Sequence, residues 1–275
     1  MDTNFPFVSI CTPTYNRRPF IPQLIKCIEQ QTYPLTNMEW IIVDDGIDPI
    51  EDLVRDLTYV TYVRYTQKIT LASKRNIMNA MAKGEFIVYM DDDDYYPPTR
   101  VYHGVVSLLQ NPQYSIAGSS ELLIYYGDRN EIWKLGSFGK YHSTAATFVF
   151  RKQLLNITNF NDKEESSEEK FFLKNYTIPL LQLDPKQTIL VFSHILNTFD
   201  KRKLIKNGVN IEKSPIQIES IILDRDIFNF FTNCIKTELR YYKYVYLPNC
   251  MGQCNIEGVT HHPQFTKPIK TLQFL

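Results

Sequence analysis

Short apolar runs alternate with amphipathic segments through residues 7–90 of this chain. The runs FVSICTP, EWIIVDDG, VTYVRYT and EFIVYM predict buried strands, because each is brief and rich in β-branched or aromatic residues. The segments between them place apolar side chains at helical spacing, and Gly84 is expected to end the last of these helices. Strands that alternate with helices form βαβ units. The pattern therefore predicts an α/β fold with a mostly parallel central sheet flanked by helices.

Polar residues follow three of these four predicted strands at the point where each strand ends. TPTYNR follows the first strand, DDG the second and DDDD the fourth. Ligands of open parallel sheets bind beyond the carboxyl ends of the strands. We therefore expect the three segments to contribute to one binding site.

The run YMDDDDYYPP places four aspartates, residues 91–94, directly after a predicted buried strand. Carboxylate oxygens suit Mg²⁺ and Mn²⁺, which usually take one or two of them together with substrate phosphates. Side chains alternate along an extended segment, so Asp91 and Asp93 point one way and Asp92 and Asp94 the other. The spacing alone leaves both registers open, and a solvated acidic loop is the alternative interpretation.

The second half of the chain is less regular. Helices are expected at residues 100–110, 163–176 and 219–235, a strand hairpin within 115–135 with its turn at GDRN, and strands near 144–150, 178–183 and 188–195. The last thirty residues are expected to form an extended tail that packs on the domain. The expected organisation is a catalytic domain at 1–204, with halves at 1–97 and 98–204, and a C-terminal segment at 205–275.

Composition excludes several classes of partner. Lysine plus arginine and aspartate plus glutamate both total 30, so the net charge is zero, and no nucleic-acid partner is expected. Neither a leader peptide nor a transmembrane segment of about 18 apolar residues is expected. The five cysteines are odd in number and scattered, which favours a reducing, cytoplasmic setting with Cys11 and Cys27 in the core.

The segments VSICTPTYNR, EWIIVDDG, LASKRNIMNAMAKGEFIVYMDDDDYYPP and SSEEKFFL occur in this order. Together they resemble the nucleotide-binding signatures of glycosyltransferase family 2, over about residues 7–200. The resemblance implies a GT-A-type, Rossmann-like fold with a smaller C-terminal extension. It also implies a metal-dependent, inverting transfer of a sugar from a nucleotide-sugar donor, most often a UDP-sugar. The acceptor would be a hydroxyl of a glycan, a protein or a small molecule, and the oligomeric state stays open.

Other classes of function fit less well. The chain lacks the G-x-G-x-x-G turn of dinucleotide-dependent oxidoreductases and the P-loop of nucleotide triphosphatases. A sugar nucleotidyltransferase remains an alternative, although its usual glycine-rich phosphate loop is missing. A glycosyltransferase-like module that only binds its ligand is the second alternative. The set Cys250, Cys254, His261 and His262 superficially resembles a zinc site, but its spacing is not a standard one.

The family's nucleotide-binding roles fall on residues at the first two strand ends and on the third helix. Each of them also has a purely structural interpretation, as core packing, a helix cap or a solvated face. The implied positions are Thr12, Pro13 and Tyr15 for the nucleobase and ribose, Asp45 for a hydrogen bond to the base, Asp44 for the turn or the ribose, and Lys74 and Arg75 near the diphosphate.

The resemblance also selects one register of the acidic run. Asp91 and Asp93 match the family's D-x-D motif, with Asp93 as the direct ligand of Mn²⁺ or Mg²⁺ and Asp91 as a further candidate metal ligand. Asp91 or Asp92 would contact the ribose or a metal-bound water, and Asp94 would cap the following turn. His194, at the end of the run TILVFSHI, is another candidate metal ligand, with a structural histidine as the alternative.

An inverting transfer needs a general base that removes the proton of the acceptor hydroxyl. The family takes this base from an acidic pair that opens a helix, and SSEEKFFL offers Glu168 and Glu169 as catalytic candidates. Glu168 aligns better, because KFFL then matches the apolar residues after the base, although the family usually has aspartate here. A solvated helix start is the alternative. His142 and Trp133 are weaker acceptor-side candidates, and Trp133 is favoured as a core residue.

Overall fold

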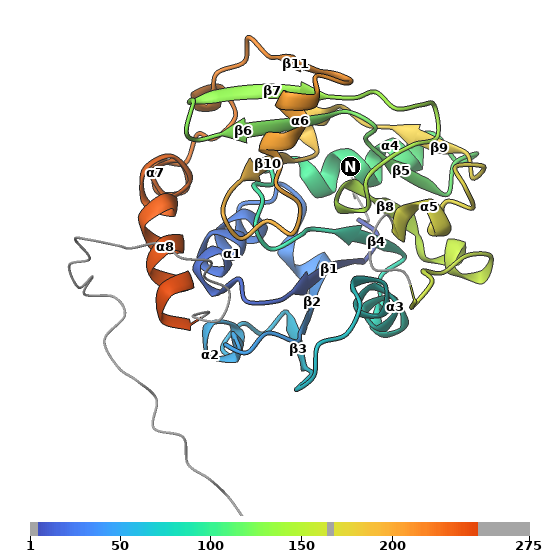
Figure 1. Cartoon of the computed structure of the whole chain (residues 1–275). Coiled ribbons are helices and arrows are strands. Elements are labelled where there is room, and N and C mark those ends of the chain that lie inside the picture. The colour runs from blue at the N-terminus through green and yellow to red at the C-terminus, as the bar shows by residue number, and fades with distance from the viewer. Residues whose placement is uncertain (1–4, 164–167, 247–275) are drawn as a thin grey trace, which may run out of the picture.

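The computed structural model describes residues 5–163 and 168–246, which form two sheets flanked by helices (Figure 1). The larger sheet has seven strands in the order β3-β2-β1-β4-β8-β5-β9. Strands β3, β2, β1 and β4 pair in parallel, β8 runs antiparallel to β4 and β5, and β9 is parallel to β5. The predicted α/β fold with a mostly parallel sheet is confirmed. The strands are Val8–Thr14 (β1), Met38–Asp44 (β2), Val60–Arg64 (β3), Phe86–Tyr89 (β4), Ile116–Gly118 (β5), Val149–Arg151 (β8) and Leu180–Gln182 (β9).

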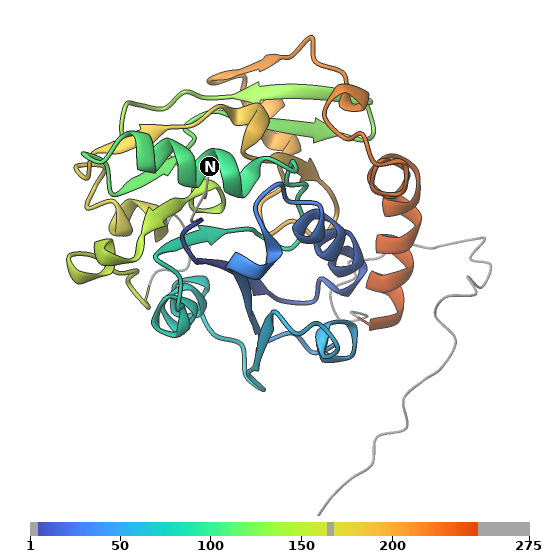
Figure 2. The same ribbon diagram turned by 180° about the vertical axis from the view of Figure 1, so that it is seen from behind.

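Alternating side chains of the parallel strands pack into two cores, one on each face of the larger sheet. Val8 and Ile10 of β1 belong to the core that α1 and α4 cover, whereas Cys11 belongs to the core beneath α3 and α5. Figures 1 and 2, seen from opposite sides, show these helices on the two faces. Cys11 and Cys27 are buried free thiols, as expected. The helices are Ile21–Glu29 (α1), Glu51–Val54 (α2), Leu71–Met81 (α3), Arg100–Gln110 (α4) and Glu168–Phe172 (α5).

A smaller, four-stranded sheet has the order β10-β6-β7-β11. Strands β6 and β7 form the expected hairpin, whose turn lies at residues 127–130. Between β10 and β11 the chain forms the helix Arg202–Asn207 (α6). The strands are Leu122–Tyr126 (β6), Glu131–Leu135 (β7), Leu190–Ser193 (β10) and Ile211–Lys213 (β11).

The two sheets are joined at the end of the acidic run, at a contact that we call the seam. Tyr95 and Leu190 form an antiparallel bridge, with N–H to carbonyl distances of 3.0 and 2.9 Å in the two directions. Asp94 Oδ1 accepts the backbone N–H of Phe192 at 2.9 Å. Asp94 therefore fastens β10 and does not cap the turn that follows it, which corrects the expectation.

The C-terminal part of the described chain is built into the same core. Helices Arg225–Asn229 (α7) and Ile235–Tyr246 (α8) are joined by a π-helical turn at Phe230–Cys234. The ring of Phe231 stacks on Phe192 of β10 at 3.8 Å. The expected boundary at residue 204 lies inside α6, and β11, beyond it, pairs with β7. Of the expected tail, residues 246–275, the first residue ends α8, and the rest, with the candidate zinc set, lies outside the described residues.

Some predicted element ends differ from the observed ones. Helix α3 ends at Met81, and Gly84 serves a different purpose: a Cβ there would lie 2.5 Å from the backbone nitrogen of Ser9, so only glycine lets the chain pass β1 so closely. The predicted helix at 219–235 begins only at Arg225, where Asp224 caps it. Short 3₁₀ helices occur at Arg18–Phe20, Leu35–Asn37, Ala145–Thr147, Lys152–Asn156, Pro185–Gln187 and Ile218–Ser220. None of the helices within residues 5–163 and 168–246 is long and apolar enough to cross a bilayer.

Candidate functional site

The carboxyl ends of β1, β2 and β4 lie side by side at one edge of the larger sheet. Strands β1 and β2 pair so that Thr14 lies opposite Asp44, and Cys11 of β1 lies opposite Tyr89 at the end of β4. The three polar segments that follow these strands therefore begin at one edge, where open parallel sheets bind their ligands.

Asp44 holds the turn after β2. Its Oδ1 accepts the backbone N–H of Gly46 at 2.8 Å. Its Oδ2 accepts the Tyr62 hydroxyl at 2.7 Å and the N–H of Ile50 at 3.2 Å. Because both oxygens are occupied and the residue is buried, Asp44 shapes the turn that presents its neighbour Asp45.

Asp45 and Lys74 form a buried ion pair that ties α3 to the edge of the sheet. The Lys74 ammonium also donates to the carbonyl of Thr14 at 2.7 Å, and Asp45 Oδ2 accepts the N–H of Ile69 at 2.8 Å. Burial lowers the pKa of Lys74 below its usual value, although the charge of Asp45 acts in the opposite direction. In this arrangement the Lys74 ammonium is engaged by the protein and does not project into open solvent.

Tyr15 presents a half-buried aromatic ring at the end of β1. The ammonium groups of Lys68 and Lys74 lie 4.7 and 5.6 Å from its ring centroid. An aromatic face beside cations suits a nucleobase linked to phosphates. Thr12 does not contribute to this surface, because its hydroxyl lies in the core, where it donates to the Met90 carbonyl at 2.7 Å and accepts the Trp40 indole N–H at 2.8 Å. Pro13 lies within β1 and is buried.

Arg75 connects the acidic run to the candidate base. Its guanidinium contacts Asp91 Oδ1 at 3.3 Å and Glu168 Oε1 at 3.2 Å, and it lies 4.6 Å from the ring centroid of Tyr89. The residue is 1% exposed, and its Nη1 has no hydrogen-bond partner among the described residues. Arg75 is therefore a buried link between α5 and the end of β4, and this position was not expected from the sequence.

Asp93 is the most strongly paired of the four aspartates. Its Oδ2 lies 3.2 Å from Arg17 Nε and 3.0 Å from His194 Nε2. Burial opposes its ionisation, but the hydrogen bond to His194 and the charge of Arg17 hold the pKa of Asp93 well below its usual value. Asp93 is therefore the aspartate that carries its charge most readily.

The pKa values of Asp91, Asp92 and Asp94 are all raised, which shows that the acidic run holds more negative charge than its neighbours compensate. Burial, with the charge of Asp93 second, raises the pKa of Asp92 to about 8. Burial likewise raises the pKa of Asp94, and it raises that of Asp91 although Arg75 partly offsets the effect. A further cation near this run would relieve the repulsion between these carboxylates.

The residues present fit a divalent metal ion. Asp93 Oδ2 and His194 Nε2 lie 3.0 Å apart, about the spacing of two adjacent ligands that each lie about 2.1 Å from the metal. In the tautomer in which His194 Nδ1 accepts the N–H of Leu196 at 3.2 Å, Nε2 carries the ring proton and donates to Asp93. His194 could ligate a metal through Nε2 only in the other tautomer, so Asp93 is the better placed metal ligand. Within the described ranges no three His, Cys, Asp or Glu side chains gather as a complete metal site. The remaining ligands would then be substrate phosphates, as is usual for Mg²⁺.

The remaining acceptor-side candidates are Glu169, His142 and Trp133. Glu169 is half-buried, and burial, followed by the charge of Glu168, raises its pKa. His142 Nδ1 lies 3.1 Å from the Ser120 hydroxyl, and its ring packs beside Tyr176 at 5.1 Å. Trp133 is partly buried against the core and donates its indole N–H to a neighbouring glutamate. His142 and Trp133 thus both make contacts that fit a structural role.

Two residues near Asp93 were not singled out by the sequence. Arg17, just after β1, contacts Asp93 and donates to the Leu196 carbonyl at 2.5 Å. Asn197 lies 2.8 Å from His194 Nε2 and accepts the His194 N–H at 2.8 Å. The adjacent arginines of TPTYNRR could have indicated a counter-charge for the acidic run, whereas no local signal marks Asn197.

Comparison with known proteins supplies a family. The family model described as Glycosyl transferase family 2 matches residues 9–174. A Haemophilus influenzae protein named as an uncharacterized glycosyltransferase is 34% identical over 108 residues, which cover 38% of this chain and 35% of that protein. The chain thus spans only about a third of the length of this curated relative.

Two solved structures resemble the fold. S. aureus TarS residues 1–349 in complex with UDP has a TM-score of 0.56 and 20% identity over 68% of this chain and 60% of its own. The mannosyltransferase PcManGT from Pyrobaculum calidifontis, in complex with GDP-Man and Mn²⁺, has a TM-score of 0.56 and 18% identity over 76% of this chain and 62% of its own. At these identities the likeness establishes the fold, and it confirms the expected GT-A-type architecture.

Proposed function

We propose that this chain, which belongs to glycosyl transferase family 2, transfers a sugar from a nucleotide-sugar donor to an acceptor hydroxyl. The observation that carries the proposal is the convergence of Tyr15, Asp45 and Asp93 from three strand ends on one edge of the sheet. The solved neighbours with UDP and with GDP-Man and Mn²⁺ support a nucleotide-sugar donor.

The donor would bind across the ends of β1, β2 and β4. The ring of Tyr15 would stack on the nucleobase, which we propose to be uracil. Asp45, which accepts a hydrogen bond from Lys74 in this structure, would accept one from the nucleobase instead when the donor binds. Asp93, with Asp91 and His194 as further candidates, would hold Mn²⁺ or Mg²⁺. The bound ion would supply charge that neutralises the diphosphate leaving group. Arg17, already beside Asp93, adds a fixed positive charge near the same place.

The acceptor hydroxyl would lose its proton to a carboxylate at the start of α5 as its oxygen attacks the anomeric carbon and the bond to the nucleoside diphosphate breaks, which would invert the configuration of the transferred sugar. The two candidates differ in environment: Glu168 is buried against Arg75, whereas Glu169 is half-buried and burial raises its pKa. A half-buried carboxylate lies within reach of an acceptor hydroxyl, whereas Glu168 Oε1 is already engaged by the Arg75 guanidinium. We therefore assign the base to Glu169 and give Glu168, which the sequence favoured, the role of fixing α5 to Arg75.

A panel of nucleotide sugars with Mn²⁺, Mg²⁺ or EDTA tests the donor half of the proposal. A UDP-sugar should raise the melting temperature in the presence of metal, and Asp93→Ala should lose both this shift and donor hydrolysis. Asp226→Ala, which removes an exposed carboxylate far along the chain, is the matched control and should keep both. Full hydrolysis in EDTA or in Asp93→Ala would refute the metal role.

Variants of the acidic pair test the acceptor half. Glu169→Gln should keep UDP binding and lose transfer, about 10²–10⁴-fold as for other general bases. Because the pKa of Glu169 is raised above 4.5 and the base must be ionised, wild-type kcat/KM should fall as pH drops through a value above 4.5. Normal transfer in Glu169→Gln together with loss in a folded Glu168→Gln would return the role to Glu168. Donor binding without turnover on any acceptor would favour the binding-only alternative.

A further inference from the structure

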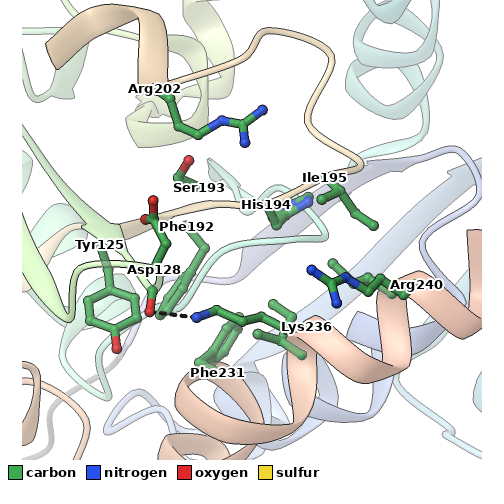
Figure 3. A pocket seen from close by; sticks show the side chains of 13 residues that line it. Tyr125, Asp128, Phe192, Ser193, His194, Ile195, Arg202, Phe231, Lys236 and Arg240 are labelled. Atoms are coloured by element: carbon green, nitrogen blue, oxygen red, sulfur yellow. Dashed lines mark hydrogen bonds between the residues drawn. The ribbon is translucent and has the colours of Figure 1, made fainter. Parts of the chain in front are cut away.

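A pocket of about 170 Å³ lies beside the candidate site, at the carboxyl end of β10 (Figure 3). One wall is aromatic: Phe192 and Phe231 stack at 3.8 Å, and the ring of Tyr125 lies 5.5 Å from Phe192. Ser193 and His194 form the rim on the side of the acidic run. The pocket thus shares only His194 with the candidate donor site, whose other residues lie at the ends of β1, β2 and β4.

Three cationic side chains line this pocket. Arg202 comes from α6, and Lys236 and Arg240 come from successive turns of α8. Lys236 donates to the Gly127 carbonyl at 2.8 Å, and Arg202 pairs with Asp200 at 2.8 Å. Figure 3 shows the guanidinium groups of Arg202 and Arg240 on two different sides of the open space.

Arg240 differs from the other two cations, because the described part of the chain offers it no hydrogen bond or ion pair. Asp128 is the single carboxylate among the described lining residues, against three cations. The lining therefore carries a positive excess beside an aromatic wall. Guanidinium groups bind phosphate oxygens in pairs, and aromatic faces pack against the C–H faces of sugars and polyols.

We propose that this pocket binds a phosphate group of the acceptor, so that the acceptor is a phosphate-bearing sugar or polyol. The inference rests on the proposed transfer function for its biological meaning, but the binding can be measured without it. The volume is below the roughly 300 Å³ at which pockets for drug-sized ligands begin, so it fits a phosphate and part of one sugar or polyol unit. The phosphate would then lie near Arg240, on the His194 side of the acidic run, and the attacking hydroxyl would lie on the α5 side.

Binding of glycerol phosphate to the full chain, measured by calorimetry beside uncharged glycerol, tests the pocket. Glycerol phosphate should bind and glycerol should not. Arg240→Gln should weaken glycerol phosphate about tenfold, since a hydrogen bond to a charged group contributes on that scale. Asp128→Asn should strengthen it, because it removes the one carboxylate of the lining. Arg225→Gln, an exposed arginine of α7 outside the pocket, is the matched control and should change nothing.

The affinity for UDP, measured on the same variants, separates the possible sources of the phosphate. Unchanged UDP binding in Arg240→Gln supports an acceptor pocket, whereas an equal loss for UDP and glycerol phosphate would assign the pocket to the donor diphosphate and overturn the inference. Equal binding of glycerol and glycerol phosphate would also overturn it. If wild type binds glycerol phosphate but no nucleotide sugar, the transfer function fails while the pocket stands.

Discussion

Replacing Arg75 by methionine should be the most destabilising single change at this site. Removing one partner of a buried ion pair costs about 3–5 kcal/mol. The Glu168 side chain is 8% exposed and that of Asp91 27%, so water can reach Asp91 but hardly reaches Glu168. The stranded Glu168 therefore sets a cost near the lower end, about 3 kcal/mol. Loss of the contact with the Tyr89 ring adds about 1 kcal/mol, for a total of about 4 kcal/mol.

The assay is urea denaturation followed by circular dichroism and by tryptophan fluorescence. Arg55→Met is the matched control, because Arg55 is exposed at the end of α2 and its loss should change the free energy of unfolding by no more than about 0.5 kcal/mol. The double variant Arg75→Met with Glu168→Gln should recover about 1–2 kcal/mol relative to Arg75→Met, because a buried amide costs less than a buried unpaired charge.

Two results would refute this reasoning. A loss below about 1 kcal/mol for Arg75→Met would mean that the carboxylates are not left buried and unpaired. A double variant that is less stable than Arg75→Met would mean that the cost does not come from the charge of Glu168. In either case Arg75 would not be the link between α5 and the acidic run.

Three further predictions test the fold around the site. Gly84→Ala should lose about 1–3 kcal/mol of stability by overpacking against backbone atoms, whereas Gly127→Ala, whose nearest neighbour would lie 3.4 Å from the new Cβ, should match wild type in the same urea titration. An alkylating reagent should leave Cys11 and Cys27 unlabelled in the folded protein, because burial raises the pKa of both thiols; mass spectrometry that finds either one rapidly modified would contradict this. Burial lowers the pKa of His142 below 6.5, so the unfolded state binds the proton more readily than the folded state does. The free energy of unfolding should therefore fall as the pH drops below about 6.5, and His142→Gln should make that decline shallower. An unchanged slope between pH 7 and 5 in this variant would count against the prediction.

The shared edge at which the ends of β1, β2 and β4 meet was predictable, because its signals are local. Each apolar run and the polar residues after it lie within about ten positions of sequence, and parallel pairing brings the strand ends together. The placement of Tyr15 and Asp45 at this edge follows from that reasoning, whereas their expected roles came from the family resemblance. Family membership and the fold class were predicted on the same short segments, and both are confirmed.

The contacts of individual side chains were less predictable, because they depend on residues far apart in sequence. Thr12 was expected to face a ligand, yet the indole N–H of buried Trp40 needs an acceptor and takes its hydroxyl. Arg17 reaches Asp93 across 76 positions, and although the adjacent arginines of TPTYNRR indicate a counter-charge, nothing in the sequence selects Asp93 as its partner. Asp94 was expected to act on its own turn, whereas its partner is a backbone N–H on another sheet.

The seam between the two sheets limits how this site can be re-engineered. Asp94 and Phe192 lie 98 positions apart, yet their hydrogen bond and the Tyr95–Leu190 bridge join the acidic run to β10. The two segments therefore have to be replaced together in any chimeric protein. A chimera that imports residues 91–95 from another family member but keeps residues 190–193 risks a mismatched bridge and an aspartate without its donor. A chimera designed to alter donor specificity should therefore take both segments from the same parent, even though they lie far apart in a sequence alignment.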